Sequence, residues 1–137
     1  MYLKNDISAR EESLLDYLWD KNIPMTANDI LLELEPKGWK PITLFKTIQS
    51  LSDKKYLEVV GLEKSGKSYA RKFEPAFSRG TYYSHLMMKK GLDKTAIADI
   101  TASLIGADIT TNEGTAQIID TLEGIIDELK ADGIAKK

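Results

Sequence analysis

The spacing of apolar residues changes twice along this chain, and that change limits the folds open to it. The spacing is helical up to residue 51, typical of strands between 56 and 73, and helical again from 77 to 129. A helix needs apolar residues three or four positions apart, whereas a half-buried strand needs them at alternate positions. The sequence therefore predicts a group of helices, one β-hairpin and a second group of helices.

Capping residues mark where the first two helices begin. Ser8 and Glu11 fit a capping box, in which each side chain binds the other residue's backbone N–H, and they predict a helix over 8–20. Thr26, with Asp29 three residues on, predicts the start of a second helix. The apolar residues that follow these caps at helical spacing are Leu14, Leu15, Leu18 and Trp19, and then Ile30, Leu31 and Leu34.

A third helix is predicted to begin at Pro41, because proline suits the first turn of a helix. The Glu-Pro-Lys-Gly segment at 35–38 ends the second helix before it. The inward face of the third helix is predicted to be Leu44, Ile48 and Leu51. Two short helices joined by a brief turn are typical of a helix-turn-helix.

A hairpin follows the third helix. Residues 56–62 are rich in strand-forming types, and residues 68–73 alternate between two faces. The basic segment 64–67 lies between them, and Gly66 tolerates the positive φ that a tight turn needs. We therefore predict a mainly α fold, a winged helix-turn-helix of three helices and a β-hairpin wing, as a DNA-binding domain over residues 1–75.

Charge is segregated along the chain, although the net charge is only −2. Residues 37–94 contain thirteen basic and five acidic side chains, a net charge of +8, and the flanking segments 1–36 and 95–137 each carry −5. Such a basic stretch between acidic ones is typical of a polyanion-binding face. A solvated basic surface without a ligand fits the charge pattern about equally well.

The exposed side of the third helix is the leading candidate for a binding surface. With Leu44 facing inward, Lys46 points almost opposite, because successive helical residues are about 100° apart. A major groove admits one helix, whose polar side chains meet base edges and phosphates. For Phe45 we favour packing against the wing over a contact with DNA. The candidate DNA-binding residues are Lys40, Ile42, Thr43, Lys46, Thr47, Gln49, Ser50, Lys54, Lys64, Lys67 and Arg71.

Residues 76–137 are predicted to form a helical dimerisation region. One helix ends at Gly91, a second covers 92–105, and a last one has apolar residues in an a/d rhythm. Little chain remains for these helices to pack against, so a two-fold dimer would bury their apolar faces. The alternative is that the last helix folds back on the winged domain. The candidate dimer-interface residues are Leu104, Ile118, Ile119, Leu122, Ile125, Ile126 and Leu129.

Several ordered motifs run through residues 8–90. They are Glu12-x-x-Leu15-x-x-Leu18-Trp19, Thr26-x-x-Asp29-Ile30, Trp39-x-x-x-Thr43, Leu51-x-x-Lys54-Lys55-Tyr56-Leu57 and the run from Gly66 to Pro75. In these motifs the chain resembles the penicillinase-repressor (BlaI/MecI) family of winged-helix repressors. The resemblance implies a homodimer that binds a two-fold symmetric DNA operator and represses transcription. By position, it places Thr43, Lys46, Thr47 and Ser50 on the recognition helix and Lys67 at the wing.

Three features depart from that family's pattern. Ser50 stands where the family usually has an arginine, which removes a strong contact to phosphate or guanine. The chain has no cysteine, so it lacks the cysteine cluster of the copper-responsive branch. None of its asparagines precedes phenylalanine, so it lacks the Asn-Phe bond that is cleaved in the antibiotic-responsive members. The sequence therefore identifies no sensor or protease partner.

Residue types that enzymes use for catalysis are sparse. His85 is the only histidine and lies among aromatic and aliphatic residues, so we assign it a structural role. The Gly-Lys-Ser triplet at 66–68 lacks the earlier glycine of a phosphate-binding loop and precedes a predicted strand instead of a helix. We expect no enzyme activity, no metal and no cofactor. Without a signal peptide or a membrane-spanning segment in the pattern, we expect a cytoplasmic protein with no membrane partner.

Two functions of different classes remain open at this point. The first is a homodimeric, sequence-specific transcriptional repressor that binds a palindromic operator through the third helix and the wing. The second is a winged-helix protein-protein interaction module that binds an acidic partner. Both use the same fold, so the fold does not decide between them. Binding to duplex DNA that weakens steeply with salt would favour the first.

Overall fold

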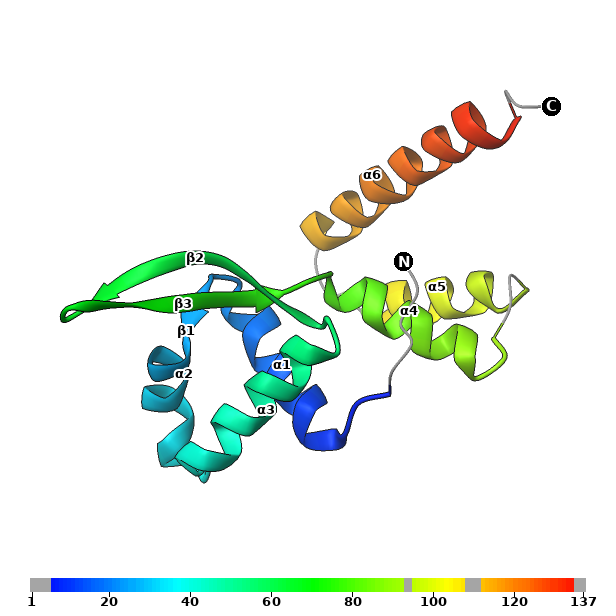
Figure 1. The fold of residues 1–137 in the computed structure, drawn as a ribbon. Coiled ribbons are helices and arrows are strands. Elements are labelled where there is room, and N and C mark those ends of the chain that lie inside the picture. The colour runs from blue at the N-terminus through cyan, green and yellow to red at the C-terminus, as the bar shows by residue number, and fades with distance from the viewer. Residues whose placement is uncertain (1–5, 93–94, 108–111, 135–137) are drawn as a thin grey trace. The chain divides into compact units, whose positions relative to one another are not determined.

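The computed structural model describes residues 6–92, 95–107 and 112–134. The chain forms two compact units, Met1–Lys89 and Lys90–Lys137. The elements of the first unit are, in chain order, α1 (Ala9–Lys21), β1 (Met25–Thr26), α2 (Ala27–Leu34), the 3₁₀ helix η1 (Glu35–Lys37), α3 (Pro41–Asp53), β2 (Leu57–Ser65), β3 (Ser68–Pro75) and α4 (Arg79–Lys89) (Figure 1). The predicted mainly α winged helix-turn-helix, with a β-hairpin as its wing, is confirmed.

Both predicted capping boxes are present. Ser8 Oγ accepts a hydrogen bond from the Glu11 backbone N–H at 3.1 Å, and Glu11 Oε1 accepts one from the Ser8 N–H at 2.9 Å. Thr26 and Asp29 form the same reciprocal pair at the start of α2, at 3.1 and 3.2 Å. Each box satisfies two backbone donors that the first turn of a helix cannot satisfy itself. The sequence therefore encodes these two helix starts locally.

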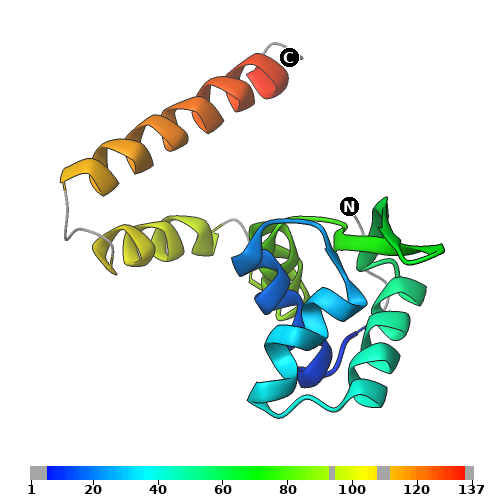
Figure 2. The same cartoon turned by 90° about the vertical axis from the view of Figure 1, so that its left-hand side faces the viewer.

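The sheet has three antiparallel strands in the order β1-β3-β2. Strands β2 and β3 form the predicted wing, and a two-residue turn with positive φ at Gly66 joins them. Strand β1 was not predicted: its two residues pair with β3, Met25 opposite Phe73. Figures 1 and 2 show α3 on the outside of the first unit, below this hairpin.

The first unit has one hydrophobic core, to which α1, α2 and α3 all contribute. The residues predicted to face inward on α3 are buried, with Leu44 and Leu51 at 0% exposure. Burial of one such side chain stabilises the folded state by roughly 1.5–3 kcal/mol. The buried apolar residues are Leu14, Leu15, Leu18, Met25, Ile30, Leu34, Leu44, Ile48, Leu51, Tyr56, Leu57, Phe73 and Tyr82.

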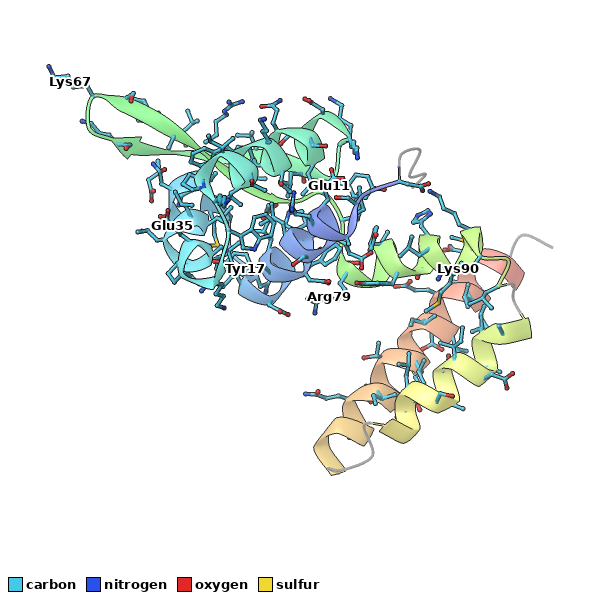
Figure 3. The ribbon with its side chains drawn as sticks, turned by 90° about the horizontal axis from the view of Figure 1, so that it is seen from below. Glu11, Tyr17, Glu35, Lys67, Arg79 and Lys90 are labelled. Atoms are coloured by element: carbon cyan, nitrogen blue, oxygen red, sulfur yellow. The ribbon has the colours of Figure 1, made fainter. Side chains whose placement is uncertain are left out.

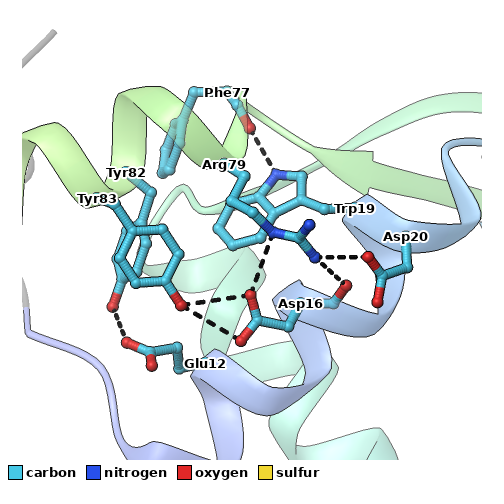
Figure 4. A network of polar contacts seen from close by, with 8 residues as sticks. All are labelled: Glu12, Asp16, Trp19, Asp20, Phe77, Arg79, Tyr82 and Tyr83. Carbon is cyan, nitrogen blue, oxygen red and sulfur yellow. Dashed lines mark hydrogen bonds and ion pairs between the residues drawn. The ribbon is translucent and has the colours of Figure 1, made fainter. Parts of the chain in front are cut away.

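Helix α4 packs against α1 and belongs to the first unit. Tyr82 is buried, and its hydroxyl donates to Glu12 Oε2 at 2.6 Å. Trp19 Nε1 donates to the Phe77 carbonyl at 2.9 Å, and the Arg79 guanidinium binds Asp20 at 2.8 Å (Figure 4). This unit therefore continues to Lys89, beyond the boundary predicted at residue 75.

The second unit consists of α5 (Thr95–Ala107), α6 (Asn112–Leu129) and the short π-helix η2 (Lys130–Ile134). Among its side chains that the structure describes, none is buried. Apolar side chains are instead exposed on both long helices, including Leu104 at 65% and Leu129 at 64%. Within the ranges described, no helix is both long enough and apolar enough to cross a membrane.

Candidate nucleic-acid interface

The outer face of α3 carries several of the predicted DNA-binding residues. Ile42 is 70% exposed, and Lys46 and Gln49 are exposed as well. Thr43 is half-buried beside them. The Gln49 amide Nε2 donates to Asp53 Oδ1 at 2.9 Å, which leaves its oxygen as an acceptor. The exposed face of α3 therefore combines apolar, polar and cationic side chains on the outside of the first unit.

The prediction that Thr47 contacts DNA is wrong. Thr47 is only 6% exposed, and its hydroxyl donates to the Thr43 carbonyl one turn earlier at 2.7 Å. It lies next to Ile48 on the inner side of the helix. There the threonine hydroxyl needs no external partner, because a backbone carbonyl of the same helix accepts its hydrogen bond. Thr47 therefore belongs to the core-facing side of α3.

Ser50 and Lys54 are turned toward the start of α1. Ser50 Oγ donates to Glu11 Oε2 at 2.8 Å, and Lys54 Nζ donates to Glu11 Oε1 at 3.0 Å. Lys54 Nζ also donates to the Asp6 carbonyl at 3.2 Å. Glu11 itself is 7% exposed. Within the unit these polar groups hold α3 onto α1, and contact of Ser50 and Lys54 with DNA stays a prediction.

The same contacts lower the pKa of Glu11. Burial of its carboxyl raises the pKa, but hydrogen bonds from the Ser8 N–H, the Ser50 hydroxyl and the Lys54 ammonium outweigh that effect. The pKa consequently lies below its ordinary value of 4.5. The resulting stability is fully present above that ordinary value and is lost as the pH falls through the lower, folded-state pKa.

Replacing Glu11 by glutamine should therefore destabilise the protein in a pH-dependent way. At pH 7 we expect a loss of about 1–3 kcal/mol in the free energy of unfolding, since Lys54 loses its ionic partner. Urea unfolding at several pH values should show the difference from the unmodified protein shrinking below about pH 4. Glu35→Gln, at an exposed carboxylate, is the control. A loss that is the same at neutral and acidic pH would contradict this account.

The wing presents cations at its tip and along β3. Lys64, Lys67 and Arg71 are exposed, and Lys67 lies at the far end of the hairpin (Figure 3). Lys40, the residue before α3, is exposed too. Within the described residues these side chains form no ion pair, whereas Lys72 pairs with Glu63 at 3.8 Å. The wing and the start of α3 therefore offer positive charge that is not paired with a carboxylate in the described part of the unit.

A second basic group, which the sequence did not reveal, lies beside the start of α3. Arg10 and Lys37 line an open groove of about 540 Å³ together with Lys40, Trp39 and Thr43. Arg10 was missed because it lies in an acidic segment of the chain, and only folding brings α1 next to the loop before α3. Cations therefore flank α3 near its start as well as on the wing.

The predicted dimer-interface residues show a consistent pattern of exposure. Ile118 and Leu122 are half-buried, and the remaining ones are exposed on α5 and α6. The structure contains a single chain, so contact between two copies stays a prediction.

His85 is half-buried in α4. Among the described residues, no group of three histidine, cysteine or carboxylate side chains is arranged to hold a metal ion.

Comparison with known proteins identifies one family model. The model described as "Penicillinase repressor" matches residues 7–128, which include most of each unit. A solved structure described as "Structure of GAS PerR-Zn-Zn" is similar over 51% of this chain, with 14% identity and a TM-score of 0.40. The match spans 44% of that solved chain's length. None of the curated proteins matches the sequence.

Proposed function

The chain belongs to the penicillinase repressor family, and from this premise we propose that it is a transcriptional repressor that binds a palindromic DNA operator as a homodimer. Helix α3 lies in the major groove, and the wing contacts the adjacent backbone. A two-fold dimer presents two copies of α3 to two half-sites, so the symmetry of the protein dictates the symmetry of the operator.

The observation that carries this proposal is the charge around the exposed face of α3. Lys46 stands at its centre, and the helix has no carboxylate before Asp53 at its end. Lys40 near the start of the helix and Lys67 on the wing form no ion pair with any residue in the ranges described. Cations on both sides of a protruding helix match the two phosphate backbones that border a major groove.

The side chains on this face divide into two roles. The lysines and arginines contact phosphates, which supplies affinity but no sequence preference. Thr43, Gln49 and Ile42 face the base edges, where Ile42 suits contact with a thymine methyl group. Because Thr47, Ser50 and Lys54 are engaged within the unit, sequence readout depends on fewer side chains than the sequence predicted.

Dimerisation is supported by the apolar stripe of α6. Leu122 and Leu129 lie seven residues apart on one side of the helix, together with Ile118, Ile119 and Ile126. None of these side chains is buried in the single chain. A stripe of this kind is typical of a helix that packs against a partner. As part of the proposal, the protein acts in the cytoplasm as a repressor without catalytic activity or a bound cofactor.

The salt dependence of duplex binding tests the proposal. We expect the folded, dimeric protein to bind a fluorescently labelled duplex at least about 100-fold more weakly at 200 mM than at 50 mM salt, as four or more phosphate contacts require. Fluorescence anisotropy measures the affinity at each salt concentration, and circular dichroism verifies that the protein stays folded at both. If no duplex is bound at low salt, the basic face serves an acidic protein partner instead and the DNA proposal fails.

A further inference from the structure

An open groove separates α3 from the wing, and two of its lining residues, Gln49 and Arg71, belong to the proposed DNA interface. Its volume is about 470 Å³, within the range of small-molecule sites. The walls are largely apolar, with Phe45 and Ile48 from α3 facing Leu57, Val59 and Phe73 from the wing. Phe45 is 41% exposed and Val59 is 48% exposed, so this apolar surface is accessible from solvent. The expected packing of Phe45 against the wing is therefore incomplete.

Charged groups at the edge of the groove favour an anion. Lys55 and Arg71 both line it, both are exposed, and neither pairs with a carboxylate in the described part of the chain. Glu58 lines the groove too, which leaves a net charge of one positive unit. The fork of an arginine matches the two oxygens of a carboxylate. A singly charged carboxylate therefore complements this site.

Ser52 also lines the groove from α3, but its Oγ is buried, so a ligand in the groove does not reach it. Apolar walls and two cations at one place are typical of a site for an amphipathic acid.

We propose that this groove binds a small aromatic carboxylate, whose ring lies against the apolar walls and whose carboxylate contacts Arg71 and Lys55. The inference rests on the proposed function, because the ligand is assigned the role of regulating DNA binding. The bound acid neutralises cations that the DNA backbone needs and wedges α3 apart from the wing. It therefore releases the operator.

Titration with 2-naphthoate, in the absence of DNA, tests the site itself. We expect saturable binding that shifts the backbone amide resonances of Ser52, Leu57, Val59 and Phe73 and leaves those of α6 unchanged. The neutral analogue 2-naphthamide should bind at least about fivefold more weakly, because it lacks the charge that the two cations attract. No shift at these residues, or equal affinity for the acid and the amide, would overturn the proposal.

Two substitutions that should change the affinity for 2-naphthoate in opposite directions test the site further. Arg71→Gln should weaken 2-naphthoate binding, and Glu58→Gln should strengthen it, each by about threefold to fivefold. Lys64→Gln removes one positive charge from the same hairpin outside the groove, so it should change the affinity less than about twofold. If all three variants bind 2-naphthoate alike, the ligand does not occupy the groove.

Adding duplex DNA separates this inference from the proposed function. We expect 2-naphthoate to raise the apparent dissociation constant of the duplex, while 2-naphthamide at the same concentration leaves it nearly unchanged. DNA binding that is unaffected by a bound acid overturns the regulatory role. Acid binding without any DNA binding contradicts the proposed function alone, and DNA binding without acid binding contradicts this inference alone.

Discussion

Replacing both Lys46 and Lys67 by alanine is expected to weaken duplex binding at low salt by at least about 100-fold, because each dimer loses four phosphate contacts. Lys46 is exposed at the centre of α3, and Lys67 is at the tip of the wing. The plot of log affinity against log salt should also become shallower, by roughly one unit for each lysine that contacts a phosphate. Fluorescence anisotropy over a salt series measures both quantities.

A second double variant controls for the change in total charge. Lys21→Ala with Lys130→Ala removes the same number of charges from α1 and η2, elements outside the proposed interface. We expect it to weaken binding less than about threefold, since neither lysine contacts a phosphate in the proposal. If the two double variants lose affinity equally, net charge alone drives binding and the face of α3 is not the interface.

Replacing Leu122 and Leu129 by glutamate is expected to convert the dimer into a monomer. Both side chains lie in the apolar stripe of α6, where dimerisation would transfer the new carboxylates out of water. We expect the dimer dissociation constant to rise at least about 100-fold, which corresponds to roughly 3 kcal/mol of lost association free energy. Sedimentation equilibrium measures the constant, and circular dichroism verifies that the helices remain.

The opposite face of α6 provides the matched control. Gln117→Glu with Gly124→Glu introduces the same two charges on the polar side of the helix, at two exposed positions, so the dimer should persist. Should both double variants dissociate alike, the apolar stripe would not be the contact. A monomer that still binds a palindromic duplex as tightly as the dimer would also contradict the proposed assembly.

Local signals in the sequence were sufficient to predict most of the first unit. The Ser8 and Thr26 capping boxes depend on residues three positions apart, and the turn at Gly66 depends on one glycine with positive φ. The inward face of α3 follows from helical spacing alone, and Leu44 and Leu51 are fully buried as predicted. Such features require no knowledge of distant contacts.

What the sequence failed to predict depends on contacts between distant segments. Strand β1 is two residues long and exists only because β3 lies beside it. Helical spacing predicts that Lys54 lies on the surface. In the structure its ammonium forms an ion pair at 3.0 Å with the carboxylate of Glu11, which lies far earlier in the chain. Arg10 joins the basic groove beside α3 by the same kind of long-range packing. Helical periodicity gives a direction for a side chain but not the partner that it meets.

Selection of bound duplexes from a random pool tests the central proposal most directly, because it reports target, symmetry and stoichiometry together. If α3 and the wing of two copies read DNA, the enriched sequences contain two inverted half-sites whose centres are about one or two helical turns apart. Enrichment should disappear when the selection is repeated with the Lys46→Ala, Lys67→Ala protein. A pool that shows no enrichment, or that converges on a single asymmetric site, would contradict the account.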